Sequence, residues 1–397
     1  MSRDPAAAPQ RRPYLHQLDL VRILPMVGVV TVHTITSTQP LDSLPANALL
    51  MVLHVNREMF FLLTAFVLAY SARPTPGSQP AVGFWRRRYP LILAPYLAWT
   101  LIYWVLLSGP LLPLGPALTR LVQFLLTGYW QLYFLLVTMQ IYALFPLLLW
   151  AARRTRPWHR QILVGSLVLQ VLYTFWLRYP LGGVPPHLHA WYDLAQMELP
   201  SYQFYVVAGI LAAEHFEEIR GWLRSRGPLV LLSVLLAAAC AELVFVIDVS
   251  RGMAPSVASN VFQPAMPLLA AATLAGLYLV GDRLLQAQPA GGGFWRVVSW
   301  AARASFGVYL AHALTLTIVV QTPLLPALGL AAPTAARTLV ALGLTLAATA
   351  LLVEVLGRTR FSLMLTGRPP LRRPAEPAEA GAGGKLIRSE FGMSSSR

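Results

Sequence analysis

Long apolar runs follow one another along most of the chain, separated by short segments rich in arginine, proline or glycine. A helix needs about 20 mainly apolar residues to cross the hydrocarbon core of a membrane. The runs therefore predict an all-α fold, a polytopic membrane helix bundle of about ten transmembrane helices. The predicted spans are residues 18–38, 47–72, 91–109, 129–150, 161–180, 201–215, 228–249, 263–281, 297–321 and 334–357.

Three segments depart from this simple pattern. The sixth span is short, and its helix can begin earlier than residue 201. Residues 117–128 are apolar but too short to cross, which predicts a re-entrant or interfacial segment before the fourth span. The loop at 181–200 is either a lid that contacts an acceptor or a solvated connector; its chemically capable side chains are His187, His189, Trp191, Asp193 and Glu198.

The number of arginine and lysine residues alternates between high and low in successive loops. With a cytoplasmic N-terminus, inside segments hold 24 of these residues and outside segments hold 4. Cytoplasmic loops carry the excess of positive charge, so both termini are predicted to be cytoplasmic. Residues 1–17 are then a cytoplasmic N-terminal segment and 18–357 the membrane domain. Residues 358–397, rich in proline, alanine, glycine and serine, are predicted to be a disordered cytoplasmic tail.

The composition is typical of a membrane protein and argues against nucleic-acid binding and cysteine-based sites. Apolar residues make up 56% of the 397 residues and charged residues 12%, and the mean hydropathy is +0.57. The net charge of +15 does not indicate nucleic-acid binding, because the basic residues lie in the gaps between apolar runs. A single cysteine, Cys240, excludes a disulfide framework or a cysteine metal site within the chain. The first apolar run lacks a clear cleavage site before Pro40, so we interpret it as a retained helix.

Arg22 and His33 stand out because both lie inside the first apolar run, in LDLVRILPMVGVVTVHT. Burying a cation in hydrocarbon is costly, so such residues usually face a protein interior. Eleven residues correspond to roughly three helical turns plus 20°, and to a rise of about 16 Å. One helix face therefore presents a cation near the inner side and an acid–base group farther out.

Counting residues from the inner side places further polar groups near His33. His33 and His312 each lie about 15 residues into their spans, so they are expected in one layer. Glu58 approaches this layer from the outer end of the second span. The three side chains can line one polar cavity, or each can be satisfied separately by helix packing. Glu58 can also simply neutralise Arg57 beside it.

The available chemistry points to acid–base catalysis. The chain has no GxSxG, HExxH, Walker or Gly-rich dinucleotide motif, and no metal site is expected. Histidine, glutamate and arginine suffice to activate a hydroxyl and to hold an anionic donor. The segment FWRRRYPLILAPY contains Arg86, Arg87 and Arg88, which either bind phosphates of a cytoplasmic ligand or anchor the helix at the membrane surface.

Five segments, in order over residues 15–357, resemble the acyltransferase-3 family of integral membrane O-acyltransferases. LDLVRILPMVGVVTVH resembles its Arg-x10-His first-helix signature, and HVNREMFFLLTAFVLAY resembles its second helix. FWRRRYPLILAPYLAWTLIY is similar to the basic entry of its third helix. GYWQLYFLLVTMQIYALFPLL and RASFGVYLAH are similar to its fourth helix and a late helix.

The resemblance implies transfer of an acyl group, acetyl or another short acyl, from cytoplasmic acyl-CoA to a hydroxyl of a glycan or small-molecule acceptor. It implies acyl-CoA as a co-substrate rather than a permanently bound cofactor. Arg22 and His33 would be the key pair, and Arg86 to Arg88 the basic donor segment. Many relatives have a second arginine at the position that Leu91 occupies here. Nothing after the tenth span resembles the SGNH hydrolase-type domain of some relatives.

These observations predict a multi-pass enzyme of the bacterial cytoplasmic (inner) membrane. His33 acts as general base or transient acyl carrier, Arg22 takes part in donor handling, and Glu58 or His312 orients His33. The alternative is a transporter or flippase of a glycan or small polar substrate, in which the same buried polar layer serves as a relay.

Overall fold

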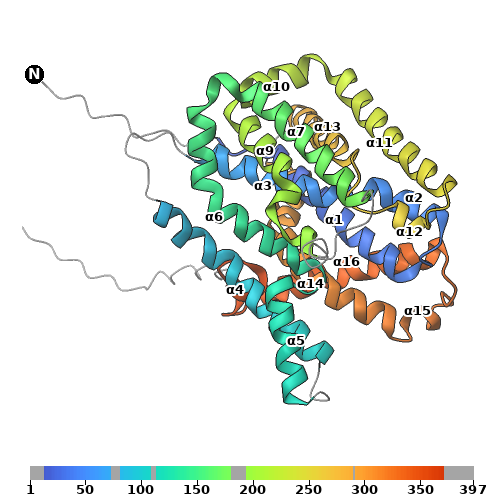
Figure 1. Cartoon of the computed structure of the whole chain (residues 1–397). Helices are drawn as coiled ribbons and strands as arrows, with labels where there is room; N and C mark the ends of the chain where they lie inside the picture. The colour runs from blue at the N-terminus through green and yellow to red at the C-terminus, as the bar shows by residue number, and fades with distance from the viewer. Residues whose placement is uncertain (1–12, 73–80, 109–112, 180–193, 289–290, 371–397) are drawn as a thin grey trace, which may run out of the picture.

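The computed structural model describes residues 13–72, 81–108, 113–179, 194–288 and 291–370, and all its elements in these ranges are helical (Figure 1). The α-helices are α1 (Gln17–Thr38), α2 (Leu44–Leu53), α3 (Val55–Ser71), α4 (Ala81–Ser108), α5 (Leu114–Thr127), α6 (Tyr133–Arg154), α7 (His159–Arg178), α9 (Gln203–Glu214), α10 (Phe216–Ser225), α11 (Gly227–Ser250), α12 (Pro255–Ala258), α13 (Met266–Ala287), α14 (Gly293–Gln321), α15 (Leu324–Ala327), α16 (Ala335–Gly357) and α17 (Ser362–Thr366). Short 3-10 turns are η1 (Trp130–Leu132), η2 (Arg156–Trp158), η4 (Ala195–Met197) and η5 (Leu199–Tyr202).

Nine helical segments in the described ranges are long and apolar enough to cross a membrane. They correspond to nine of the ten predicted spans, and the all-helical membrane bundle is confirmed. The second span is α2 and α3 together, with a break at His54. The sixth is α9, which has only 12 residues and is preceded by η5.

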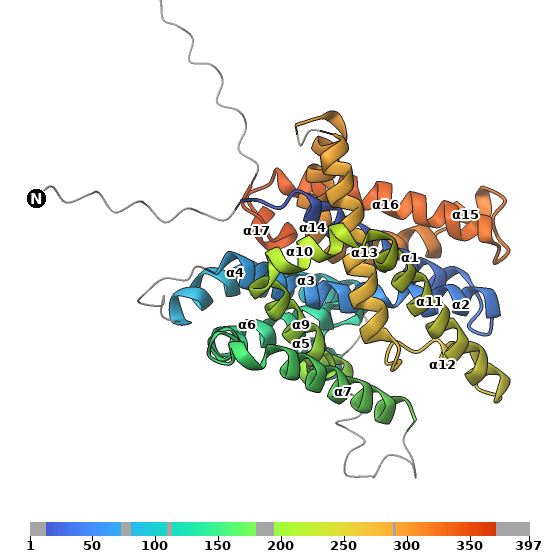
Figure 2. The ribbon, with the colours of Figure 1, turned by 90° about the horizontal axis from the view of Figure 1, so that it is seen from above.

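Helix α1 occupies the centre of the bundle. It packs against α3, α13, α14 and α16, and Figure 2 shows α13 running across it. One apolar core contains buried residues of α1, α3, α6, α9, α11 and α13; the other contains buried residues of α1, α4, α6, α14 and α16. Because α1 contributes to both cores, its polar residues lie between the two halves of the bundle.

Helix α4 begins ten residues before the predicted span at 91–109. The hydropathy pattern ends the apolar run at the arginine-rich segment, but arginine is a good helix former, so the helix continues through this segment. Arg86, Arg87 and Arg88 consequently lie on the first turns of α4 rather than in a loop.

Helix α5 covers the short apolar segment and folds back along α4. The indole N–H of Trp104, near the end of α4, donates to the Ala117 carbonyl at 2.8 Å. The hydroxyl of Tyr96, midway along α4, donates to the Leu125 carbonyl at 2.8 Å. The chain thus returns to the middle of α4 before α6 begins.

Two predicted segments fall largely outside the described residues. His187, His189, Trp191 and Asp193 of the 181–200 loop lie outside, whereas Glu198 lies between η4 and η5. Of the predicted tail, residues 371–397 lie outside. Its beginning contains α17, which packs against α4 and α16.

Candidate functional site

Helices α1 and α14 run side by side in the same direction and bring two histidines together. Ser299 donates to Asp19 at 3.0 Å near the start of the two helices. Fourteen residues farther along α1, the ring centroids of His33 and His312 are 5.3 Å apart. The structure therefore places these imidazoles in one layer, as the depth count predicts.

The hydrogen bonds of His312 determine which ring nitrogen carries its proton. Its Nδ1 lies 2.7 Å from the carbonyl oxygen of Tyr309 and 3.2 Å from that of Val308. A carbonyl only accepts, so Nδ1 carries the hydrogen and Nε2 keeps its lone pair. His312 is fully buried, and its Nε2 has no hydrogen-bond partner within the described part of the chain. It presents a buried proton acceptor beside His33.

Trp130 completes this layer, although the sequence analysis did not single it out. Its ring meets the His33 imidazole edge-on, with the centroids 4.4 Å apart. Trp130 has φ of 44°, a left-handed backbone conformation that is strained for a bulky residue. The only local signal in the sequence is Gly128, which adopts φ of 71° two residues earlier.

The turn that carries Trp130 is fixed to both α4 and α14. The Gln131 side-chain amide donates to the Tyr103 hydroxyl at 3.1 Å, and that hydroxyl donates to the Leu310 carbonyl at 2.8 Å. The Tyr309 hydroxyl donates to the Gln131 carbonyl. These buried hydrogen bonds fix the conformation of the turn and hold Trp130 against His33.

Arg22 lies near the opposite end of α1, with its side chain 30% exposed and its Nη1 4.0 Å from Asp19. Asp19 is buried and also accepts hydrogen bonds from Tyr14 and Ser299. Partial desolvation, together with the bond to Asp19, raises the pKa of the Tyr14 hydroxyl, although the residue as a whole is exposed. Much of the charge of Asp19 is thus engaged by these hydroxyls, which leaves the Arg22 guanidinium available to an anion.

Arg368 adds to this cationic end. Burial lowers its pKa, and repulsion from the nearby cations Arg22 and Arg303 lowers it further. Its Nη2 approaches the Ala302 carbonyl of α14 at 3.5 Å. The preceding residue, Gly367, has φ of 70°, and a Cβ atom there would lie 2.4 Å from the Phe306 ring of α14 and 3.5 Å from the Leu91 carbonyl oxygen of α4. Three arginines therefore gather where α1, α4, α14 and the chain after α17 meet.

Glu58 pairs with Arg57 beside it. Its Oε1 accepts from the Arg57 Nε at 3.0 Å and forms an ion pair with Nη2. Arg57 also donates to the Tyr133 hydroxyl at 3.3 Å and lies over the rings of Tyr202 and Phe262. The second oxygen, Oε2, is buried without a partner among the described residues. The structure does not join Glu58 to His33 or His312 by a hydrogen bond.

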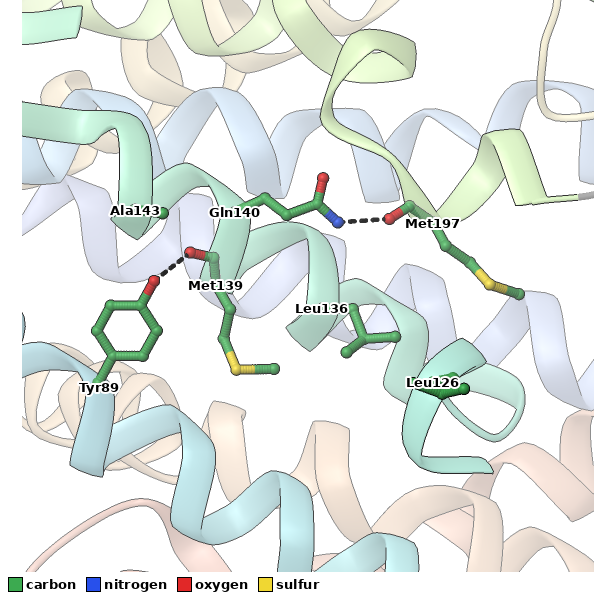
Figure 3. A pocket seen from close by; sticks show the side chains of 7 residues that line it. All are labelled: Tyr89, Leu126, Leu136, Met139, Gln140, Ala143 and Met197. Atoms are coloured by element: carbon green, nitrogen blue, oxygen red, sulfur yellow. Dashed lines mark hydrogen bonds between the residues drawn. The ribbon is translucent and has the colours of Figure 1, made fainter. Parts of the chain in front are cut away.

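The basic segment of α4 adjoins a separate pocket of about 320 Å³, shown in Figure 3. Arg86 and Arg87 are exposed and Arg88 is half-buried. In the pocket, the hydroxyl of Tyr89 donates to the Met139 carbonyl at 2.9 Å, and the Gln140 amide donates to the Met197 carbonyl at 2.7 Å. Its polar lining side chains are Tyr89 and Gln140, and both are engaged in these hydrogen bonds.

The arrangement combines an imidazole pair in the interior with an arginine cluster at one end of the same helix. No three His, Cys, Asp or Glu side chains within the described ranges are grouped so as to hold a metal ion. A family model described as an acyltransferase domain matches residues 15–354. No curated protein and no solved structure matches the chain. The chain belongs to the acyltransferase 3 family, as a multi-pass membrane enzyme that transfers acyl groups.

Proposed function

We propose that this enzyme transfers a short acyl group from cytoplasmic acyl-CoA to a hydroxyl of a carbohydrate or secondary metabolite. The observation that carries the proposal is the His33–His312 pair, with 5.3 Å between ring centroids. His33 lies on α1, which also carries Arg22, and His312 lies on α14. The two ends of this helix face are about 16 Å apart, a span that an extended thioester arm can bridge. We place the enzyme in the bacterial cytoplasmic membrane, with the arginine end inside.

In the proposed step, His33 accepts the proton of the acceptor hydroxyl. The oxygen attacks the thioester carbonyl carbon, a carbon–oxygen bond forms and the carbon–sulfur bond breaks. The CoA thiolate leaves and takes the proton from the His33 imidazolium, so the enzyme is regenerated. The Nε2 lone pair of His312 can accept the second N–H of His33 and fix the orientation of its ring. As an alternative, His33 carries the acyl group transiently as an acyl-imidazole.

The donor phosphates are proposed to bind at the arginine end. Arg22 and Arg303 are joined there by Arg368, which follows Gly367 near the Phe306 ring of α14 and the Leu91 carbonyl of α4. Relatives with a second arginine at the Leu91 position would not need this contribution. Arg368 therefore supplies, from the chain after α17, a cation that α4 lacks. Arg86, Arg87 and Arg88 extend the positive surface along the first turns of α4.

The test is release of CoA and acylation of an acceptor by the purified, reconstituted protein. His33→Ala is expected to lower the transfer rate at least 100-fold, within the range for loss of a general base. Arg22→Ala and Arg368→Ala are expected to raise the KM for acyl-CoA. Thr36→Ala, an exposed position on the same helix, is the matched control and should behave as wild type.

Two results would contradict the proposal. Near wild-type transfer by His33→Ala, at equal protein level, would remove its central residue. Failure of the wild-type protein to consume acyl-CoA, together with substrate movement across vesicles that His33→Ala abolishes, would favour the transporter alternative. Hydroxylamine-sensitive radiolabel retained from acyl-CoA on the wild-type protein, but absent from His33→Ala, would identify the acyl-carrier role.

A further inference from the structure

A cavity of about 560 Å³ lies between the last turns of α1 and α14 and the turn that precedes α6. Its lining residues are Ser37, Tyr129, Trp130, Leu316, Thr317, Val320 and Gln321. None of the functional assignments above uses this space. Its volume falls in the usual range for small-molecule sites in proteins.

The cavity adjoins the imidazole pair. Ser37 follows His33 by four residues on α1, and Leu316 follows His312 by four residues on α14. Each is therefore about one helical turn, roughly 6 Å, beyond its histidine on a similar face. Trp130 belongs to both places, because it lines the cavity and its ring contacts His33.

The lining indicates what the cavity can hold. Two aromatic rings, Tyr129 and Trp130, provide flat apolar surface, and Ser37, Thr317 and Gln321 provide hydroxyl and amide groups. None of the seven lining side chains is charged. An anionic or cationic ligand would lose its hydration there without gaining a counter-ion, whereas a neutral ring with hydroxyl groups matches both kinds of surface.

The strained backbone at Trp130 indicates that surrounding contacts fix the position of its ring. The left-handed φ of 44° is unfavourable for tryptophan, and the bonds of Gln131 to Tyr103 and Leu310 keep the turn in place. Strain that surrounding contacts maintain is typical of functional sites. Relaxing the backbone at Trp130 would withdraw the ring from His33 and from the cavity wall.

We propose that this cavity is the acceptor site, that it takes an uncharged hydroxyl-bearing ring such as a sugar, and that Trp130 is the residue that positions the acceptor against His33. This inference rests on the proposed function, because it assigns the second substrate of the same reaction. It adds a location for that substrate, a selection against charged acceptors, and a positioning role for Trp130.

The test uses the reconstituted full chain with acetyl-CoA and two probes, methyl β-glucoside and glucuronic acid. We expect methyl β-glucoside to accelerate CoA release and glucuronic acid to be at least tenfold less effective. Trp130→Ala should raise the KM for methyl β-glucoside at least tenfold while the KM for acetyl-CoA changes less than twofold. Trp130→Phe should recover most of the effect. Trp150→Ala, an exposed position on α6, is the control.

Each result bears on a different claim. If the wild-type protein consumes acetyl-CoA but Trp130→Ala leaves the glucoside KM unchanged, the positioning role is wrong. If methyl β-glucoside does not stimulate, or glucuronic acid works equally well, the neutral-ring assignment is wrong. If acetyl-CoA is not consumed at all, the proposed function fails.

A second measurement examines the cavity without relying on catalysis. Gln321→Cys in a Cys240→Ser background introduces one thiol at the cavity wall. Methyl β-glucoside should slow its labelling by a thiol reagent at least tenfold, and glucuronic acid should not. Equal labelling with and without the glucoside would show that the cavity does not bind it.

Discussion

At the scale of single residues, the two ring nitrogens of His312 have different environments, and substitution can separate them. His312→Asn places an amide near the former Nδ1 but removes Nε2. We expect the fold to be retained and the transfer rate to fall at least tenfold, because His33 loses its neighbouring acceptor. His312→Ala removes both nitrogens and packing volume, and should also lower the free energy of unfolding by about 1–3 kcal/mol.

Rates and thermal unfolding of the two variants, measured in the same detergent, distinguish these effects. Ser305→Ala on α14, whose hydroxyl donates only to the Ala302 carbonyl of its own helix, controls for a small polar-to-apolar change in the same helix. A His312→Asn enzyme that turns over like wild type would show that Nε2 does not assist His33, while leaving the role of His33 itself intact.

The Arg57–Glu58 pair is expected to act on stability more than on catalysis. Both side chains are buried, so Arg57→Ala leaves the Glu58 carboxylate without its cation. Breaking a buried pair from one side typically costs about 3–5 kcal/mol, whereas replacing both partners by apolar residues can be nearly neutral. The double variant Arg57→Leu, Glu58→Leu should therefore unfold at a higher temperature than Arg57→Ala. Equal unfolding temperatures would contradict the pairing.

The sequence could predict which site residues lie together where this depended only on their positions along the helices. His33 and His312 lie in the same layer because α1 and α14 run in parallel from the Ser299–Asp19 hydrogen bond, which the two histidines follow by 14 and 13 residues, so counting residues suffices. Trp130 and Arg368 were not found, because their positions depend on turns. Trp130 approaches His33 only after α5 folds back, and Arg368 follows a short helix in a segment whose composition resembles a disordered tail.

At the scale of elements, the turn between α5 and α6 requires glycine at its start. Gly128 has φ of 71°, and a Cβ atom there would lie 2.4 Å from the backbone nitrogen of Tyr133. Gly128→Ala is therefore expected to displace the turn and withdraw Trp130 from His33. The substitution should reduce transfer at least tenfold, and the cost of forcing an L-residue into this conformation is about 1–3 kcal/mol.

The control for this prediction is Gly115→Ala on α5, where a Cβ atom would meet nothing within 4 Å. Tryptophan fluorescence and acceptor KM, compared between the two variants, report on the position of Trp130. Unchanged acceptor KM in Gly128→Ala would mean that the turn does not position the substrate.

Helix ends were predictable only where hydropathy and helix formation change together. The spans at α1, α11 and α16 begin and end within one residue of the prediction, since polar or breaking residues flank them. At α4 the two signals separate, because arginines end the apolar run but continue the helix. No proline or glycine marks the break at His54 between α2 and α3 in the sequence. At this break, His54 Nδ1 lies 2.8 Å from the Ser259 carbonyl oxygen.

At the scale of the whole molecule, orientation decides whether the donor can reach its site. The strong arginine asymmetry between loops predicts that the start of α1 faces the cytoplasm. In a Cys240→Ser background, Asp42→Cys and Ala332→Cys should react with a membrane-impermeant thiol reagent in intact cells. Trp158→Cys should react only after permeabilisation. All three positions are exposed, so differences in labelling report the membrane side.

The opposite labelling pattern would leave the fold unchanged but would separate Arg22, Arg303 and Arg368 from cytoplasmic acyl-CoA. The histidine layer would then lie nearer the cytoplasm, with the arginine end about 16 Å away on the outer side. Cytoplasmic acyl-CoA would reach the imidazoles without meeting the arginines proposed to bind its phosphates. The expected pattern instead places donor phosphates and acceptor ring at opposite ends of one helix face. His33 is then the point where the thioester from one side meets the hydroxyl from the other.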